Sequence, residues 1–130
     1  MIELYGYELS GNCFKIRLLL SFLNIEYKPN NIEFYPSEEH KSENFLKINP
    51  LGQIPVISDD GFILRDAQAI MIYLSKKYDK TESWYPIDHP EKIGLISQWL
   101  AFADSITGSA SAARLHDTFF YTNFDIEKCR

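Results

Sequence analysis

The stretch from Asn49 to Ile70 restricts the possible fold of this chain more than any other. The Asn-Pro-Leu-Gly segment at 49–52 predicts a turn, because a helix cannot continue through this proline and glycine. An apolar, β-branched run follows at 53–57, and the Asp-Asp-Gly triplet at 59–61 predicts a hairpin turn. The stretch therefore predicts two antiparallel strands and then a helix that is capped by Asp66.

Pro55 lies inside the first of these strands, where a proline removes a hydrogen-bond donor from the ladder. One explanation is a cis Ile54–Pro55 bond, which would leave the backbone N–H and C=O of Ile54 to pair with an extended ligand. The alternative is a trans proline in an edge strand. For an isolated X-Pro bond the trans form is favoured, and only the surrounding motif reverses this preference.

Patterns before and after this stretch predict the remaining elements. Alternation predicts a strand at Ile2–Tyr7, with Leu4 facing the core. A second strand, short and interrupted by Pro29, is expected at Glu26–Ile32. Apolar stripes with helical spacing predict a helix from about Asn12 to Asn24 and a third helix ending near Lys77. Between them, Ser37-Glu38-Glu39 predicts the start of a short helix with three buried residues, Phe45, Leu46 and Ile48.

The predicted order is β-α-β-α-β-β-α, which makes the first domain an α/β domain. Strand–helix–strand units pair in parallel, whereas a short turn joins antiparallel strands, so we expect a mixed four-stranded sheet with helices on its faces. Residues 1–79 form this domain and residues 80–88 form a polar linker. An all-helical part follows at 89–130, and its long first helix carries Ile93, Ile96, Leu100 and Ala103 on one face.

Composition excludes several classes of function. The net charge of −5, without a basic run, argues against nucleic acid as a partner. No apolar run is long enough to span a bilayer, and Cys13 and Cys129 suggest no disulfide framework, so we expect a cytoplasmic protein without membrane association. His89, His116 and Cys129 lack metal-ligand spacing, so no metal is expected.

The sequence also resembles a known family. Asn-Pro-Leu-Gly-Gln-Ile-Pro-Val at 49–56, followed by Asp-Ala-Gln-Ala-Ile at 66–70 and Tyr-Leu at 73–74, closely resembles the glutathione-binding half of cytosolic glutathione S-transferases. The resemblance runs from Ile2 to about Ala113 and is strongest to serine-type, theta- or phi-like bacterial members. It implies a thioredoxin-like first domain, a cis Pro55, a homodimer and an all-helical second domain, of which 89–130 would be an incomplete part.

Ser10 is the catalytic candidate that this resemblance implies. In serine-type members, a serine after the first strand donates a hydrogen bond to the sulfur of bound glutathione and favours the thiolate. The alternative role is a helix cap alone. Cys13 completes a Ser-x-x-Cys pattern and would be activated at a helix N-terminus, but a buried spacer is the preferred interpretation. Tyr5 and Tyr7 rank below Ser10.

The glutathione-binding residues are carried over from the family by position. Ile54, after Gln53, should offer its backbone to the cysteinyl part, and Asp66 should lie near the γ-glutamyl amine. Ala67 replaces the usual serine, so we expect weaker binding through the free N–H groups of the helix N-terminus. Lys41 is preferred over His40 as the cation for the glycyl carboxylate, with a solvated surface charge as the alternative.

The leading hypothesis is therefore a glutathione transferase that conjugates reduced glutathione to a small electrophile. Two other hypotheses remain open. One is a non-catalytic binding or scaffold module with the same fold, or an inactive fragment. The other is a glutathione-dependent thiol reductase that uses Cys13.

Overall fold

The computed structural model of the chain describes residues 1–86 and 88–119, with side chains as far as Arg114. The chain divides into two compact units, of which the first is Met1–Asp88 and the second begins at His89.

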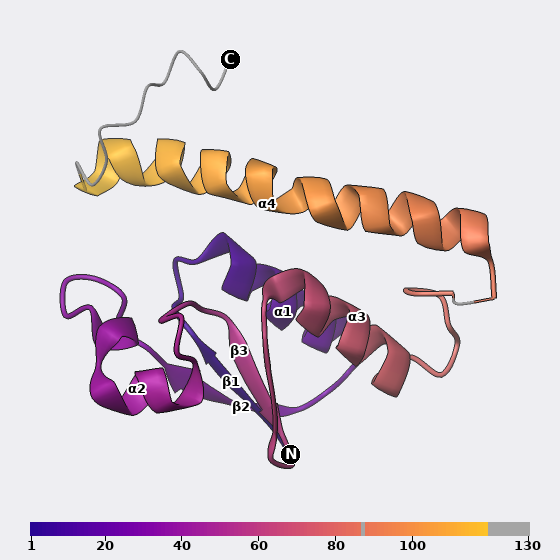
Figure 1. Cartoon of the computed structure of the whole chain (residues 1–130), viewed down its shortest axis with the longest axis horizontal. Helices are drawn as coiled ribbons and strands as arrows, with labels where there is room; N and C mark the ends of the chain where they lie inside the picture. The colour runs from indigo at the N-terminus through magenta and orange to yellow at the C-terminus, as the bar shows by residue number, and fades with distance from the viewer. Residues whose placement is uncertain (87, 120–130) are drawn as a thin grey trace. The chain divides into compact units, whose positions relative to one another are not determined.

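The first unit contains a four-stranded sheet and its helices (Figure 1). The elements confirm the predicted order, and a short 3₁₀ turn, η1, is added before the second helix. In chain order they are β1 (Ile2–Gly6), α1 (Gly11–Phe22), β2 (Tyr27–Asn31), η1 (Glu39–Lys41), α2 (Glu43–Ile48), β3 (Val56–Asp59), β4 (Phe62–Arg65) and α3 (Ala67–Tyr78).

The sheet has the strand order β2-β1-β3-β4. β1 pairs in parallel with β2 and antiparallel with β3, and β3 pairs antiparallel with β4, which confirms the expected mixed sheet. α1 and α3 cover one face, and α2 lies on the other (Figure 1). The fold of this unit is therefore the thioredoxin-like arrangement.

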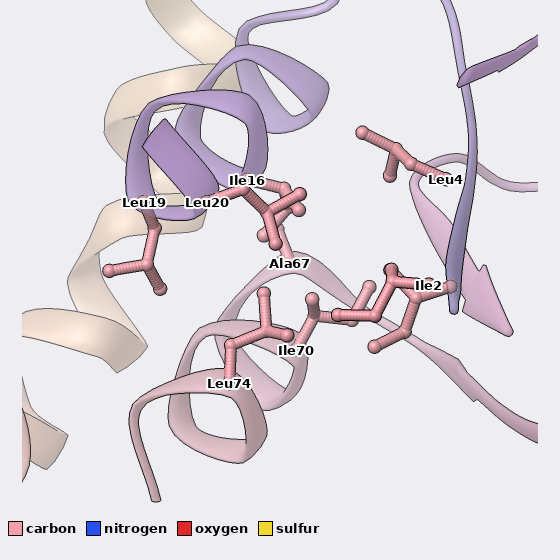
Figure 2. Packing of buried hydrophobic residues seen from close by; sticks show 9 residues of the cluster. Ile2, Leu4, Ile16, Leu19, Leu20, Ala67, Ile70 and Leu74 are labelled. Carbon is pink, nitrogen blue, oxygen red and sulfur yellow. The ribbon is translucent and has the colours of Figure 1, made fainter. Parts of the chain in front are cut away.

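Most of the hydrophobic core lies between the sheet and the pair α1 and α3. Figure 2 shows side chains of β1, α1 and α3 pointing toward one another in this space. Leu4 faces this core as predicted, and is 4% exposed. A smaller cluster on the opposite face joins α2 to the sheet and contains Ile32, Phe45 and Val56. Two cores of this kind fix both helix layers against the same sheet.

The structure corrects two local predictions. The helix expected from Ser37 is interrupted at Glu38, whose φ is +52°, and α2 begins only after Ser42, whose hydroxyl accepts from Phe45 N at 3.2 Å. This cap sets the helical phase so that Phe45 is buried and Leu46, expected inside, is 37% exposed. β3 begins at Val56 rather than at 53, which agrees with the missing donor of Pro55.

The second unit is described as one long helix, α4 (Pro90–Phe119). The expected stripe of Ile93, Ile96, Leu100 and Ala103 is half-buried. The side chain of His116 and all of Cys129 lie outside the described residues. Within the described residues, no helix combines the length and apolar character needed to cross a membrane.

Candidate functional site

The strand register brings the candidate residues to one end of the sheet. Tyr5 of β1 pairs with Val56 of β3, and Val56 pairs with Arg65 of β4, so the three residues form one row across the sheet. The chain leaves this row toward Ser10 after β1, and toward Asp66 after β4. It enters the row from Ile54 before β3. Both α1 and α3 begin at this end of the sheet.

Ser10 is the N-cap of α1. Its backbone is extended, with φ −75° and ψ 122°, and its Oγ accepts from Cys13 N at 3.2 Å. Its own N–H donates to Tyr7 O at 3.1 Å, which fixes the loop that leads into the helix. Because the hydroxyl accepts in the cap, its proton remains for donation to a second group. The cap and the proposed catalytic role are therefore compatible.

Cys13 is completely buried in the first turn of α1. Burial raises the pKa of its thiol, and the nearby Ser10 hydroxyl, the Tyr7 backbone and the Arg17 charge oppose this only in part. Gly6 allows this close approach, because a Cβ at position 6 would lie 2.9 Å from Cys13 Sγ. A buried thiol that remains protonated has the properties of a spacer rather than of a nucleophile.

The loop before β3 holds Ile54 at the edge of the site. The Ile54–Pro55 bond is cis. The side chain of Asn49, which is 1% exposed, donates from Nδ2 to Gln53 O at 2.8 Å and fixes the preceding turn. Among the described residues, no hydrogen bond is made by the backbone N–H or C=O of Ile54. This loop therefore presents a donor and an acceptor that the fold itself does not use.

Asp66 lies in a conformation that residues with a side chain rarely adopt. Its φ is +76° and its ψ is 123°, and it joins β4 directly to α3. Its Oδ1 accepts from Ala69 N at 2.9 Å, while the carboxylate stays exposed. Backbone conformations of this kind cost about 1–3 kcal/mol and occur frequently at ligand sites. The methyl group of Ala67 is 3% exposed and belongs to the core.

The two cation candidates differ in environment. Lys41 is exposed and forms an ion pair with Glu38, its Nζ lying 2.6 Å from Oε1. His40 is 6% exposed, and its ring stacks on Phe34 with the centroids 3.8 Å apart. Burial lowers the pKa of His40, with a further contribution from Lys41, so the imidazole is neutral at neutral pH. Lys41 is thus the charged member of this pair.

One polar group near Ser10 is not indicated by the sequence pattern. Asn12 Oδ1 is buried in the first turn of α1 without a hydrogen-bond partner among the described residues, as is His40 Nδ1. The only sequence signal was an asparagine shortly after the helix cap. Its burial depends on long-range packing, which the local sequence does not show. Among the described residues, no group of three His, Cys, Asp or Glu side chains is placed to hold a metal ion.

Comparisons with known proteins agree with this arrangement. Residues 4–82 match the family model described as the glutathione S-transferase N-terminal domain. Human glutathione S-transferase theta-2 is 43% identical over 72 residues, which cover 55% of this chain and 29% of the relative. Rat glutathione S-transferase theta-1 is 35% identical over 88 residues, 68% of this chain and 36% of the relative. The chain thus spans about a third of these two relatives.

Two solved structures extend the comparison. Human theta-2, solved with glutathione and an unknown ligand, superposes with a TM-score of 0.76 at 31% identity, covering 84% of this chain and 44% of the other. A delta-class glutathione transferase from Nilaparvata lugens gives a TM-score of 0.82 at 29% identity, covering 98% of this chain and 60% of the other.

The first unit has the thioredoxin-like fold of the glutathione S-transferase N-terminal domain. The chain belongs to the glutathione S-transferase family, which confirms the predicted resemblance.

Proposed function

We propose that this chain binds reduced glutathione and transfers it to a small electrophile, with Ser10 stabilising the thiolate. One observation carries the proposal: the register row Tyr5–Val56–Arg65 gathers Ser10, Ile54 and Asp66 at one end of the sheet. The N-termini of α1 and α3 lie at the same end, and helix N-termini favour anionic groups.

Each part of glutathione has a proposed partner in this arrangement. The unused backbone N–H and C=O of Ile54, held in place through Gln53, pair with the cysteinyl part as a short added strand. Asp66 binds the γ-glutamyl amine, and the Ala67 N–H at the start of α3 binds the γ-glutamyl carboxylate. Lys41 releases its ion pair with Glu38 and instead pairs with the glycyl carboxylate.

The energy required for thiolate stabilisation fits one hydroxyl and one helix end. Lowering a thiol pKa from about 8.5 to about 7 requires about 2 kcal/mol. A helix N-terminus contributes about 0.3–1 kcal/mol, and a hydrogen bond to a charged group contributes about 1.5–3 kcal/mol. Ser10 at the N-terminus of α1 supplies both. The burial of Cys13 supports this mechanism over one that uses the Cys13 thiol.

The test is titration of the purified chain with reduced glutathione, followed by the pKa of the bound thiol from its ultraviolet absorbance. Ser10→Ala removes the hydroxyl that would donate to the thiolate without adding a charge, and it also removes the cap of α1, at a cost of about 1 kcal/mol of stability. We expect the bound thiol pKa to rise by at least one unit, or about 1.4 kcal/mol. Ser42→Ala is the matched control, because Ser42 caps α2 with the same 3.2 Å geometry. An unchanged thiol pKa in Ser10→Ala would contradict the proposed role.

A binding or scaffold role without catalysis is the second candidate. The observation in its favour is Ala67, whose buried methyl group stands where the resemblance implies a serine that bonds the ligand. Ala67→Ser distinguishes the two. If the chain binds glutathione weakly and Ala67→Ser tightens binding, the transferase proposal is supported. If neither form binds, the scaffold role is favoured.

We also propose that the chain forms a homodimer, as the family resemblance implies. The apolar side chains that α4 exposes support association.

A further inference from the structure

A cavity lies on the other side of β1 from Ile54 and Asp66 of the proposed glutathione site. It has a volume of about 250 Å³ and is lined by residues of β1, the loop that follows it, β2 and Arg17 in the middle of α1. Ile54 and Asp66 belong to the β3 and β4 side of the sheet, whereas this cavity opens at β2, the free edge strand. The two sites are therefore separated by the central strand β1.

The interior of this cavity is mainly apolar. Leu4, Tyr7, Tyr27 and Pro29 contribute to its walls. The volume lies just below the roughly 300 Å³ at which pockets for drug-sized ligands begin. A single aromatic ring or a short alkyl chain is the appropriate size for the apolar part of an occupant.

Arg17 supplies the only positive charge among the residues that line the cavity. Its Nη2 donates to the backbone O of Glu8 at 3.0 Å, and its guanidinium lies 5.8 Å from the centroid of the Phe14 ring. These contacts hold the guanidinium in place. Among the described residues, no carboxylate lies within 4.0 Å of it, so its charge has no ion-pair partner there.

From this geometry we propose that the cavity binds a small carboxylic acid with an aromatic or short alkyl body. The body fills the apolar interior, and the carboxylate pairs with Arg17, whose planar fork of N–H donors matches a carboxylate. Asn31 at the edge of β2 is placed to add a polar contact. Glu8 also lines the cavity, and its negative charge limits the affinity for an anion. The proposal does not depend on glutathione binding.

The test is titration of the 130-residue chain with phenylacetate, followed through backbone amide signals in two-dimensional NMR. We expect shifts at Gly6, Tyr7 and Asn31, and we expect them to persist with saturating glutathione. Phenylethanol, which has a similar body without the charge, should bind about tenfold more weakly to the unaltered protein. This comparison needs no mutation and therefore no assumption about folding.

Three variants make the test specific. Arg17→Gln should weaken phenylacetate binding about tenfold. Glu8→Gln should tighten it by removing a repulsive charge. Lys47→Gln, which removes an exposed positive charge on α2, should leave it unchanged. Shifts confined to Ile54 and Asp66, equal affinity for the acid and the alcohol, or equal effects of Arg17→Gln and Lys47→Gln would each overturn the proposal.

Discussion

Asp66 combines a strained backbone with an exposed carboxylate. Its φ of +76° is tolerated far better by glycine, asparagine and aspartate than by other residues. The side chain caps Ala69 N at 2.9 Å, so one carboxylate oxygen serves the helix and the other can serve a ligand. A strained residue retained at the start of a helix is thus consistent with a binding function.

We predict that Asp66→Asn separates these two roles. Asparagine tolerates the positive φ and can cap Ala69 N, so the free energy of unfolding should change by less than about 0.5 kcal/mol. The loss of charge should weaken glutathione binding about tenfold, because an ammonium group loses its anionic partner. Urea unfolding and titration calorimetry measure the two effects. Asp66→Ala is the comparison: it removes both functions, so it should also cost about 1 kcal/mol of stability.

At the residue scale, the sequence predicts the role of a side chain where that role depends on residues nearby in the sequence. The Asp66 cap follows from a polar residue just before an apolar helical stripe, and the row that unites it with Ser10 follows from the strand order. Asp59 was different. The Asp-Asp-Gly triplet predicts a turn, where an exposed carboxylate is expected, yet Asp59 is only 3% exposed. Its partners come from α3, and no local pattern indicates contacts across that distance in sequence.

Asp59, at the end of β3, accepts hydrogen bonds from side chains near the end of α3 and so connects the two elements. Its Oδ2 accepts from Lys77 Nζ at 2.6 Å, Tyr78 Oη at 2.7 Å and Tyr73 Oη at 2.9 Å. Burial tends to raise the pKa of Asp59, but the hydrogen bonds from Lys77, Tyr78 and Tyr73 outweigh it and hold the pKa below its usual range. The carboxylate form therefore stabilises the packing of α3 on the sheet.

We predict that Asp59→Asn lowers the free energy of unfolding by about 2–3 kcal/mol at neutral pH, because three donors lose a charged acceptor. The native carboxyl binds its proton less readily than the unfolded one, whose pKa is about 3.9. Its stabilisation is therefore complete above about pH 5 and is lost as the pH falls through the native pKa. Urea unfolding between neutral and acidic pH should show a shallower acid loss in the variant.

The neighbouring Asp60 provides the control for this experiment. Asp60 is exposed and pairs with the N-terminal amine at 2.6 Å. Because a surface ion pair contributes about 0–1 kcal/mol, Asp60→Asn should have little effect. Equal losses in the two variants, or an unchanged acid slope in Asp59→Asn, would contradict the role given to the Asp59 cluster.

The contact between β1 and α1 depends on Gly6. A Cβ at this position would lie 2.9 Å from Cys13 Sγ and 3.2 Å from Cys13 Cβ, so Gly6→Ala should cost about 1–3 kcal/mol through overpacking. Adding Cys13→Ala removes the closer contact and should restore part of this loss in a double-mutant cycle. Thermal and urea unfolding measure both. Gly108→Ala in α4, where a Cβ meets nothing within 4 Å, is the control and should not destabilise.

At the element scale, apolar periodicity, apolar runs and turn residues together predicted the strands and long helices of the first unit. The exception was the segment before α2. There the Glu38 backbone, with φ +52°, and the Ser42 cap decide where the helix begins. Several serines and glutamates in this segment satisfy the same local rules for a helix start. Packing of Phe45 against the sheet selects among them, and that packing is not visible in the local sequence.

At the scale of the whole molecule, α4 lacks the polar face of an ordinary surface helix. Residues 93–103 include no charged side chain. Four large apolar side chains are at least half exposed and follow one another at intervals of four, three and four residues: Leu95, Trp99, Phe102 and Ile106. This spacing forms one stripe and suits packing against another helix. A helix that is apolar around its circumference is normally buried.

We predict that this stripe contributes to the interface of a homodimer. The chain should sediment at twice its mass of 15.1 kDa, and the variant with both Trp99→Glu and Phe102→Glu should sediment as the monomer. Two buried glutamates without partners would oppose association strongly. Glutamate is a good helix former, so the helical signal of α4 in circular dichroism should persist.

Phe14→Glu replaces an apolar side chain of α1 that is 55% exposed and serves as the control for general loss of surface hydrophobicity. A monomeric unaltered chain would contradict the dimer, and equal dissociation by Phe14→Glu would move the interface away from α4. If only the α4 variant dissociates, the apolar stripe is explained as a contact between two copies of the chain.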